Sequence, residues 1–370
     1  MSKELKYFIK TSVTGLDAIK RAPIVEYNTR IKCLRIGDIS QTNSYDNWGY
    51  CEVNKTNYEK FHIEKNDIFI ARTGASIGCS FIATKNYDSV FNNGLIRVRV
   101  NENALPQYIY YLLKTNNFLS FIIATGMSSA TQPNIRINDL LKYSVNKVHS
   151  LTEQQHIVNT IGTVDNLIEK TNQKIILFEK LLKYIYQIYF NDKSSVNKLG
   201  DVIKYFVGGT FKSKDYTNLS SWKLITIKNI GDSGFNLDNI TYFSMKPEYE
   251  KFKLEIGDIL LTMTGYVGRT GIVDSEDCYL NQRIIKITCE SKALIYTYLL
   301  MDKENISSLG HGSAQPNLSI SDFLNIKVPF GENEVNYFKK YDYIFDAILK
   351  NRMNIRKLTN LKKLLLSKYF

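Results

Sequence analysis

Two stretches of the sequence, separated by almost half the chain, repeat one unusual phrase. Residues 128–145 read SSATQPNIRINDLLKYSV, and residues 311–328 read HGSAQPNLSISDFLNIKV. The two share Gln, Pro, Asn, Ile, Asp, Leu and Val in the same columns of a 370-residue chain. A single tripeptide would carry little weight, whereas a longer pattern repeated at half the chain's length indicates an internal duplication. The fold must therefore consist of two similar halves.

Other segments repeat in the same order and predict the elements of each half. Short β-rich runs bounded by turns predict strands, and the runs that follow them predict helices. The matching pairs are 31–39 with 222–231, 64–83 with 254–273, 92–100 with 280–288, and 106–122 with 293–309. We therefore expect an α+β protein with two similar mixed α/β globules, related by an internal pseudo-two-fold repeat.

Each globule is followed by a long amphipathic segment. Residues 152–190 contain no proline and a single glycine, and their apolar residues recur at steps of mostly three and four. Residues 333–370 repeat this pattern. Such a seam is typical of a coiled coil, and Thr152 followed by Gln154 and Gln155 predicts the start of the first helix.

A helix with one apolar stripe needs a partner to cover that stripe, and the other copy is the obvious one. We expect an antiparallel pair, about 57 Å long, that holds the globules at its two ends. The alternative, in which each helix folds back on its own globule, would leave much of the seam uncovered. The predicted segments are a first globule, 1–150, a central helix, 151–192, a second globule, 193–331, and a C-terminal helix, 332–370.

The charge of the chain favours a polyanionic partner. The formal net charge is +12, and residues 350–370 contain seven basic residues and no acidic one. A basic balance of this kind is typical of nucleic-acid binding. No apolar run approaches the roughly 18–20 residues of a membrane span. The N-terminus lacks the core of a signal peptide, so we expect a cytoplasmic protein.

The repeated features together resemble the specificity subunit of type I restriction–modification systems. They are the twin Thr-Gly loops, Thr73-Gly74 and Thr264-Gly265, the twin Gln-Pro-Asn phrases, and the two long helices. The resemblance covers nearly the whole chain. It implies that each globule is a target recognition domain and that together they read a bipartite, asymmetric site on double-stranded DNA. It also implies that the paired helices set the gap and dock two methyltransferase subunits, through which restriction (motor–nuclease) subunits join.

The same resemblance implies a non-catalytic chain. The sequence has no Gly-rich ATP motif and no metal-ligand spacing of His, Cys, Asp or Glu. We expect no cofactor or metal in this chain, S-adenosylmethionine in the methyltransferase partner, and ATP and Mg in the motor–nuclease partner. One departure is that the second long helix opens NEVNYF, so Glu153-Gln154-Gln155 is not repeated. The alternatives are the specificity subunit of a type II restriction-and-methylation enzyme, and a coiled-coil adaptor that does not bind DNA.

The first candidate DNA-binding residues lie in the repeated phrases. Glycine lets a backbone approach a ligand closely, so the Thr-Gly loops could present N–H groups to a phosphate. These candidates are Arg72, Thr73, Gly74, Thr264, Gly265 and Arg269. The alternative is that both loops are turns of the scaffold. Gln132 and Gln315 are candidates for contact with the DNA backbone, although the rigid Gln-Pro-Asn phrase is better explained as a structural joint.

The second group lies where the copies differ, because different base sequences need different readers. Residues 40–56 include Asn47 and Trp48, and residues 208–222 include Lys212, Lys214 and Tyr216. Amide and basic side chains can read base edges in the major groove. The alternative is that these loops are ordinary solvated surface.

Overall fold

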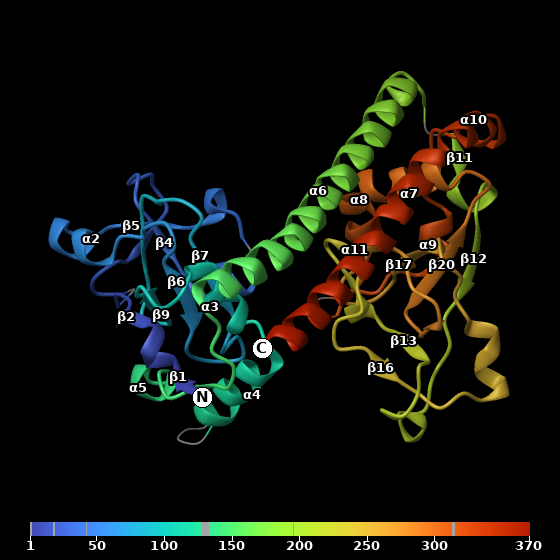
Figure 1. The fold of residues 1–370 in the computed structure, drawn as a ribbon. Coiled ribbons are helices and arrows are strands. Elements are labelled where there is room, and N and C mark those ends of the chain that lie inside the picture. The colour runs from blue at the N-terminus through green and yellow to red at the C-terminus, as the bar shows by residue number, and fades with distance from the viewer. Residues whose placement is uncertain (1, 18, 42, 128–132, 195, 313–314) are drawn as a thin grey trace. The chain divides into compact units, whose positions relative to one another are not determined.

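The computed structural model describes all residues except 1, 18, 42, 128–132, 195 and 313–314 (Figure 1). The chain forms two compact units. The first contains Met1–Asn166 and Thr359–Phe370, and the second contains Leu167–Leu358. The first unit therefore includes the last residues of the chain, and the long central helix contributes residues to both units. The four segment boundaries expected from the sequence stay predictions.

The first unit contains two four-stranded sheets. One has the order β2-β9-β6-β7 and is antiparallel, and the other has the order β3-β5-β4-β8 with β4 and β8 parallel. The strands are β1 (Lys3–Glu4), β2 (Ile9–Thr14), β3 (Ile24–Val25), β4 (Lys32–Leu34), β5 (Tyr50–Cys51), β6 (Ile68–Ala71), β7 (Ser80–Ile82), β8 (Ser89–Phe91), β9 (Leu95–Val100) and β10 (Ser144–Val145). The helices are α1 (Ile36–Ser40), α2 (Lys55–Phe61), α3 (Pro106–Leu112), α4 (Asn116–Met127) and α5 (Ile137–Leu140).

Strand β6 lies at the centre of the first unit and is buried on both faces. Ile68 and Ile70 belong to a core that also includes residues of α3, α4 and the first turns of the central helix. Phe69 and Ala71 belong to a second core shared with the β3-β5-β4-β8 sheet. Successive side chains of a strand point to opposite faces, so the apolar run of β6 fills both cores at once.

The second unit repeats this topology. Its antiparallel sheet has the order β12-β20-β17-β18, and its second sheet, β16-β13-β19, again contains one parallel pair, β13 with β19. The strands are β11 (Asn197–Lys198), β12 (Lys204–Val207), β13 (Lys223–Ile225), β14 (Ile230–Gly231), β15 (Gly234–Phe235), β16 (Thr241–Tyr242), β17 (Ile259–Thr262), β18 (Thr270–Ile272), β19 (Cys278–Leu280), β20 (Ile284–Thr288) and β21 (Lys327–Val328). The short helices are α7 (Lys292–Met301), α8 (Lys303–Ser308) and α9 (Ile320–Leu324). The expected α+β fold with an internal repeat is confirmed.

The central helix, α6 (Leu151–Phe190), is 40 residues long and begins with a capping box. The backbone N–H of Ser150 donates to Glu153, and the backbone N–H of Glu153 donates to the Ser150 hydroxyl. Ser150 therefore caps the helix, two residues earlier than the expected Thr152. Gln154 is buried, and its side chain accepts from the Leu105 N–H at 2.9 Å and donates to the His149 carbonyl at 3.0 Å. These bonds tie the helix start to its globule.

In the first unit, the beginning of α6 pairs with the end of the C-terminal helix, α11 (Asp342–Tyr369). Lys362 Nζ lies 2.6 Å from Asp165 Oδ1, and the rings of His156 and Tyr369 are in edge contact. Residue numbers rise along one helix as they fall along the other, so the pairing within this unit is antiparallel.

In the second unit, the end of α6 pairs with α10 (Glu332–Phe338) and the beginning of α11. The rings of Tyr189 and Tyr337 stack at 4.5 Å, and Arg352 lies 3.4 Å from Glu179. This pairing is also antiparallel. The expected continuous helix over 332–370 is instead two helices joined by a tighter turn, Lys339–Tyr341, where the aromatic residues around Phe338 pack closely.

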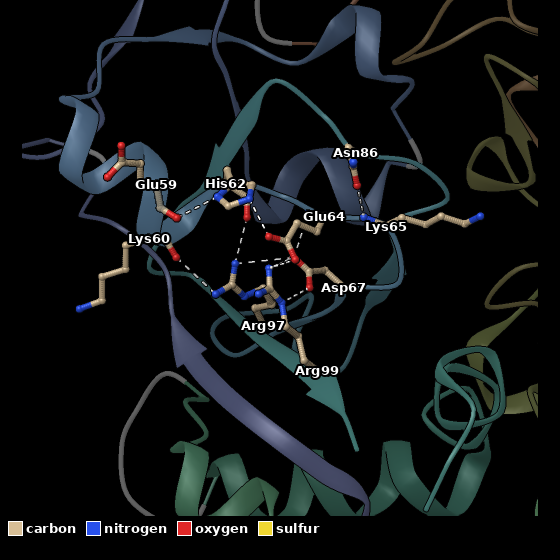
Figure 2. Close-up of polar contacts among 9 residues, drawn as sticks. All are labelled: Glu59, Lys60, His62, Glu64, Lys65, Asp67, Asn86, Arg97 and Arg99. Atoms are coloured by element: carbon tan, nitrogen blue, oxygen red, sulfur yellow. Dashed lines mark hydrogen bonds and ion pairs between the residues drawn. The ribbon is translucent and has the colours of Figure 1, made fainter. Parts of the chain in front are cut away.

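The turn before β6 carries the most buried carboxylate network of the first unit (Figure 2). Asp67 is 1% exposed and accepts from the Glu64 N–H at 3.0 Å, which closes the turn. Arg99 of β9 donates to both oxygens of Asp67, at 2.5 and 3.1 Å, and Arg97 lies 3.6 Å away. Glu64 bridges Arg99 and His62. Two arginines of this unit are thus committed to the scaffold.

Replacing Asp67 with alanine should destabilise the first unit by about 2–4 kcal/mol, because it leaves Arg97 buried without its carboxylate. The chain contains two tryptophans, Trp48 and Trp222, one in each unit. Urea unfolding of Asp67→Ala in a Trp222→Phe background, followed by Trp48 fluorescence, measures the loss. The exposed Asp46→Ala is the control, and equal unfolding midpoints for the two variants would contradict a structural role for the network.

Candidate nucleic-acid interface

Within each unit, the Thr-Gly loop contacts the Gln-Pro-Asn phrase, and the two segments form a joint. In the first unit, the Gly74 N–H donates to the Pro133 carbonyl at 3.0 Å, and Thr73 forms a β-bridge with Asn134. In the second unit, the Gly265 N–H donates to the Pro316 carbonyl at 2.8 Å. Thr264 and Asn317 form the corresponding bridge. The Thr-Gly loop after the central strand is therefore fastened to the Gln-Pro-Asn phrase in each copy.

The loop glycines are required by backbone conformation. Gly74 has a φ of 72° and Gly265 a φ of 76°, and the second glycines of the loops, Gly78 and Gly268, have φ values of 86° and 84°. Residues with a Cβ pay roughly 1 kcal/mol or more in this left-handed region. The Gly74 and Gly265 amides already donate to proline carbonyls, so they do not face an external phosphate in this structure. The geometry favours the scaffold-turn interpretation for both glycines.

The side chains around the joint differ between the copies. In the first unit, Arg72 Nη2 donates to Asn134 Oδ1 at 3.0 Å. In the second, the Thr264 hydroxyl donates to Asn317 Oδ1 at 2.6 Å. Each asparagine thus holds its loop through the side chain as well as the backbone. Gln315 is exposed, and Gln132 lies outside the described residues.

The first divergent loop places its two candidates differently. Trp48 is only 3% exposed, packs against Tyr45 and Tyr87, and donates its indole N–H to the Asn43 carbonyl at 3.2 Å. It is a core residue in this structure, because a large indole in a small sheet layer is better packed than solvated. Asn47, its neighbour, is exposed at the end of a short turn.

The second divergent loop presents its three candidates on a fixed turn, Ser213–Asp215. Lys212, Lys214 and Tyr216 are exposed. Asp215, the last residue of the turn, is buried, lies 2.6 Å from Lys246 Nζ, and accepts from the Tyr249 hydroxyl at 2.6 Å. The bond from Lys246, followed by that from Tyr249, lowers the pKa of Asp215. Two lysines and a tyrosine at the surface suit a nucleic-acid contact.

Arg269 lies in a surface cluster that the sequence did not reveal. Its guanidinium donates to both oxygens of Asp232, at 3.3 and 2.6 Å, and lies 3.8 Å from the ring centroid of Tyr266. Lys303 donates to the same carboxylate at 2.7 Å. Asp232 and Lys303 are far apart in sequence, so only the fold shows that they meet. Tyr266, which lies between the two loop glycines Gly265 and Gly268, is exposed.

Two properties of the described residues concern metal ions and membranes. Over residues 2–370, apart from the positions left undescribed, no three His, Cys, Asp or Glu side chains are grouped to hold a metal ion. Nor is any helix in those residues long and apolar enough to cross a membrane. The candidate residues described above supply amide, hydroxyl, basic and aromatic groups.

Comparison with known proteins agrees with the duplicated architecture. The family model described as "Type I restriction modification DNA specificity domain" matches twice, at residues 26–179 and 191–354. A curated relative, the "Type I restriction enzyme MjaVIII specificity subunit" of Methanocaldococcus jannaschii, is 23% identical over 335 residues, covering 80% of this chain and 76% of that protein. The crystal structure of the type I restriction–modification S subunit from M. genitalium has a similar fold, with a TM-score of 0.58 and 18% identity, covering 100% of this chain and 96% of that one.

Replacing Asn317 with alanine should loosen the joint of the second unit. The variant removes the acceptor of the Thr264 hydroxyl, at a cost of about 1 kcal/mol, and weakens the loop closed by the Gly265 N–H. Hydrogen–deuterium exchange should show faster uptake at residues 264–266. Asn325→Ala, at an exposed helix end, is the control. Identical uptake in the two variants would show that the asparagine does not hold the loop.

Proposed function

The chain belongs to the type I restriction modification DNA specificity family, two copies of whose domain cover most of its length, and we propose that it recognises a bipartite, asymmetric DNA site with one unit on each half. Membership makes it a DNA-sequence recognition subunit of a restriction–modification system. The observation that carries the proposal is the pair of units with one shared topology and joint but different exposed loops. A shared frame with different readers suits two different half-sites.

The differences between the units support asymmetry. The first unit exposes the amide of Asn47 on its divergent loop, whereas the second exposes Lys212, Lys214 and Tyr216. Arg269, in the loop between β17 and β18, occupies the same position as the uncharged Cys79 in the loop between β6 and β7. Basic and amide side chains prefer different base edges, so the two units should prefer different sequences.

We propose that α6 docks a methyltransferase subunit through an exposed apolar stripe. Leu177, Leu181, Tyr184 and Ile188 follow one another at steps of four, three and four, and each is 44–63% exposed. These steps place the four side chains on one side of the helix, away from the buried seam that contains Leu182. A row of exposed large apolar residues is typical of a protein–protein contact.

The C-terminal helix carries a shorter version of this stripe in the first unit. Because Tyr189-Phe190 and Tyr369-Phe370 end equivalent helices, Leu181 and Tyr184 correspond to Leu361 and Leu364. Both leucines are exposed. Two equivalent stripes suit two methyltransferase subunits, which motor–nuclease subunits would join.

In this proposal S-adenosylmethionine belongs to the methyltransferase, ATP and Mg belong to the motor–nuclease, and the assembly works in the cytoplasm. Because the family match concerns DNA specificity, a protein-only adaptor is not favoured.

Methylome sequencing of a host that expresses this chain with its methyltransferase tests the bipartite site. The expected result is one split motif, with two different half-sites and a gap of fixed length. A continuous motif, or no motif, would contradict the proposal.

Inserting one heptad into both long helices should lengthen the gap between the half-sites and leave the half-sites unchanged, because in this proposal the helices set the gap and the globules read the bases.

Leu181→Glu should weaken binding of the methyltransferase at least thirtyfold, because it places a charge at the centre of the apolar stripe. Isothermal titration measures the affinity, and circular dichroism checks that α6 remains helical. Gln187→Glu, exposed on α6 but off the stripe, carries the same new charge and should bind like the parent chain. Unchanged affinity for Leu181→Glu would exclude the stripe as the docking site.

A further inference from the structure

The second unit contains a surface ion cluster in which one carboxylate holds two cations. The hairpin β14–β15 carries Asp232 at its tip, between Gly231 and Gly234. Arg269 contacts both oxygens of Asp232, and Lys303 contacts one of them at 2.7 Å. The bond from Lys303, followed by that from Arg269, lowers the pKa of Asp232, so the carboxylate is ionised at neutral pH. The cluster therefore keeps one net positive charge.

The cluster is open to solvent on the carboxylate side. The side chain of Asp232 is 66% exposed, whereas that of Arg269 is 19% exposed. Tyr266, 59% exposed, lies under the guanidinium at 3.8 Å from the ring centroid. A planar cation stacked on an aromatic ring is pre-organised to bind an anion bidentately. The carboxylate thus covers a cation pair that would otherwise face solvent.

The framework around the cluster is closely packed. A Cβ at Gly268 would lie 3.2 Å from the Lys303 carbonyl, so the loop that carries Arg269 is seated on the first turn of α8. Gly234 has a φ of 98°, and a Cβ there would lie 2.9 Å from the Arg352 guanidinium of α11. These two contacts fix the spacing of the hairpin tip and the two cations.

The first unit has no counterpart of this ion cluster among its described residues. Cys79 occupies the position of Arg269, and Asn116, which begins α4, occupies the position of Lys303 at the start of α8. The arginine of its Thr-Gly loop, Arg72, is held by a neutral amide, Asn134 Oδ1. Among the described residues, the carboxylate-covered cation pair therefore occurs in the second unit and not in the first.

We infer that Arg269 and Lys303 bind a phosphate of the DNA backbone, and that Asp232 occupies the position of this phosphate when DNA is absent. The inference rests on the proposed function and adds a regulated contact to it. A carboxylate with two oxygens on a guanidinium has the same bidentate geometry as a phosphate on that group. Solvent-exposed ion pairs contribute little net free energy, so exchanging the carboxylate for a phosphate costs little. Asp232 then restrains binding to DNA of any sequence, because phosphate contacts carry no sequence information.

The test compares Asp232→Asn with the parent chain, each assembled with its methyltransferase partner. Fluorescence anisotropy measures affinity across a salt series, for one duplex that contains the recognised site and one that lacks it. Asp232→Asn should raise affinity for both duplexes by the same factor, about three- to tenfold, and steepen the salt dependence. Asp238→Asn makes the same charge change at an exposed residue nearby and should leave affinity near that of the parent.

A second set of variants separates the phosphate contact from a general charge effect. Arg269→Gln with Lys303→Gln should lower affinity for both duplexes equally, and adding Asp232→Asn to that pair should change nothing further. Lys303→Gln alone should also lower affinity for both duplexes. It perturbs folding less than the double variant, because the Lys303 side chain lies at the surface, at the start of α8. If Asp232→Asn behaves like Asp238→Asn, or still raises affinity without the two cations, the inference is overturned while the proposed function stands. If the parent assembly binds neither duplex, both fall.

Discussion

The apolar seam of the two long helices is the constraint on which the rest of the structure depends. Neither helix can cover its own stripe, and each fully buried Leu, Ile or Phe contributes roughly 1.5–3 kcal/mol. In the second unit Leu182 and Phe190 share a core with Phe338 and Ile348. In the first unit Ile157 and Ile161 share a core with Leu366. Because the pairing is antiparallel within each unit, the last residues of the chain complete the core of the first globule.

Each globule also depends on a joint that closes the loop after its central strand. That strand is buried on both faces, so a displacement of the Thr-Gly loop that follows it would disturb the packing on both of its faces. A glycine in the left-handed conformation and a proline carbonyl close that loop in both copies. The duplicated phrase therefore has the same structural role in both units, and the segments that differ between the units lie outside it.

Charge is distributed between scaffold and surface in ways that residue type alone does not reveal. Arg97 and Arg99 hold Asp67 inside the first unit, so these cations serve folding. Arg269 and Lys303 hold an exposed carboxylate in the second unit, so these cations remain close to solvent. The net charge of +12 is therefore a poor guide to which basic residues meet DNA. Burial and pairing decide which of them are free to exchange partners.

The sequence by itself determined the duplication, the α+β class, the long helices with their seams, and the equivalence of the two joints. These follow from local periodicity and from repeated spacing, which need no knowledge of distant contacts. The sequence also contained the Ser150–Glu153 capping box, although the cap was expected at Thr152. Only the tertiary structure decided that Trp48 is buried, that the C-terminal helix is divided at Lys339–Tyr341, and that Asp232 meets Arg269 and Lys303. The burial of Trp48 against Tyr87 and the Asp232 cluster join residues far apart in the chain, and their meeting is set by packing rather than by any local pattern.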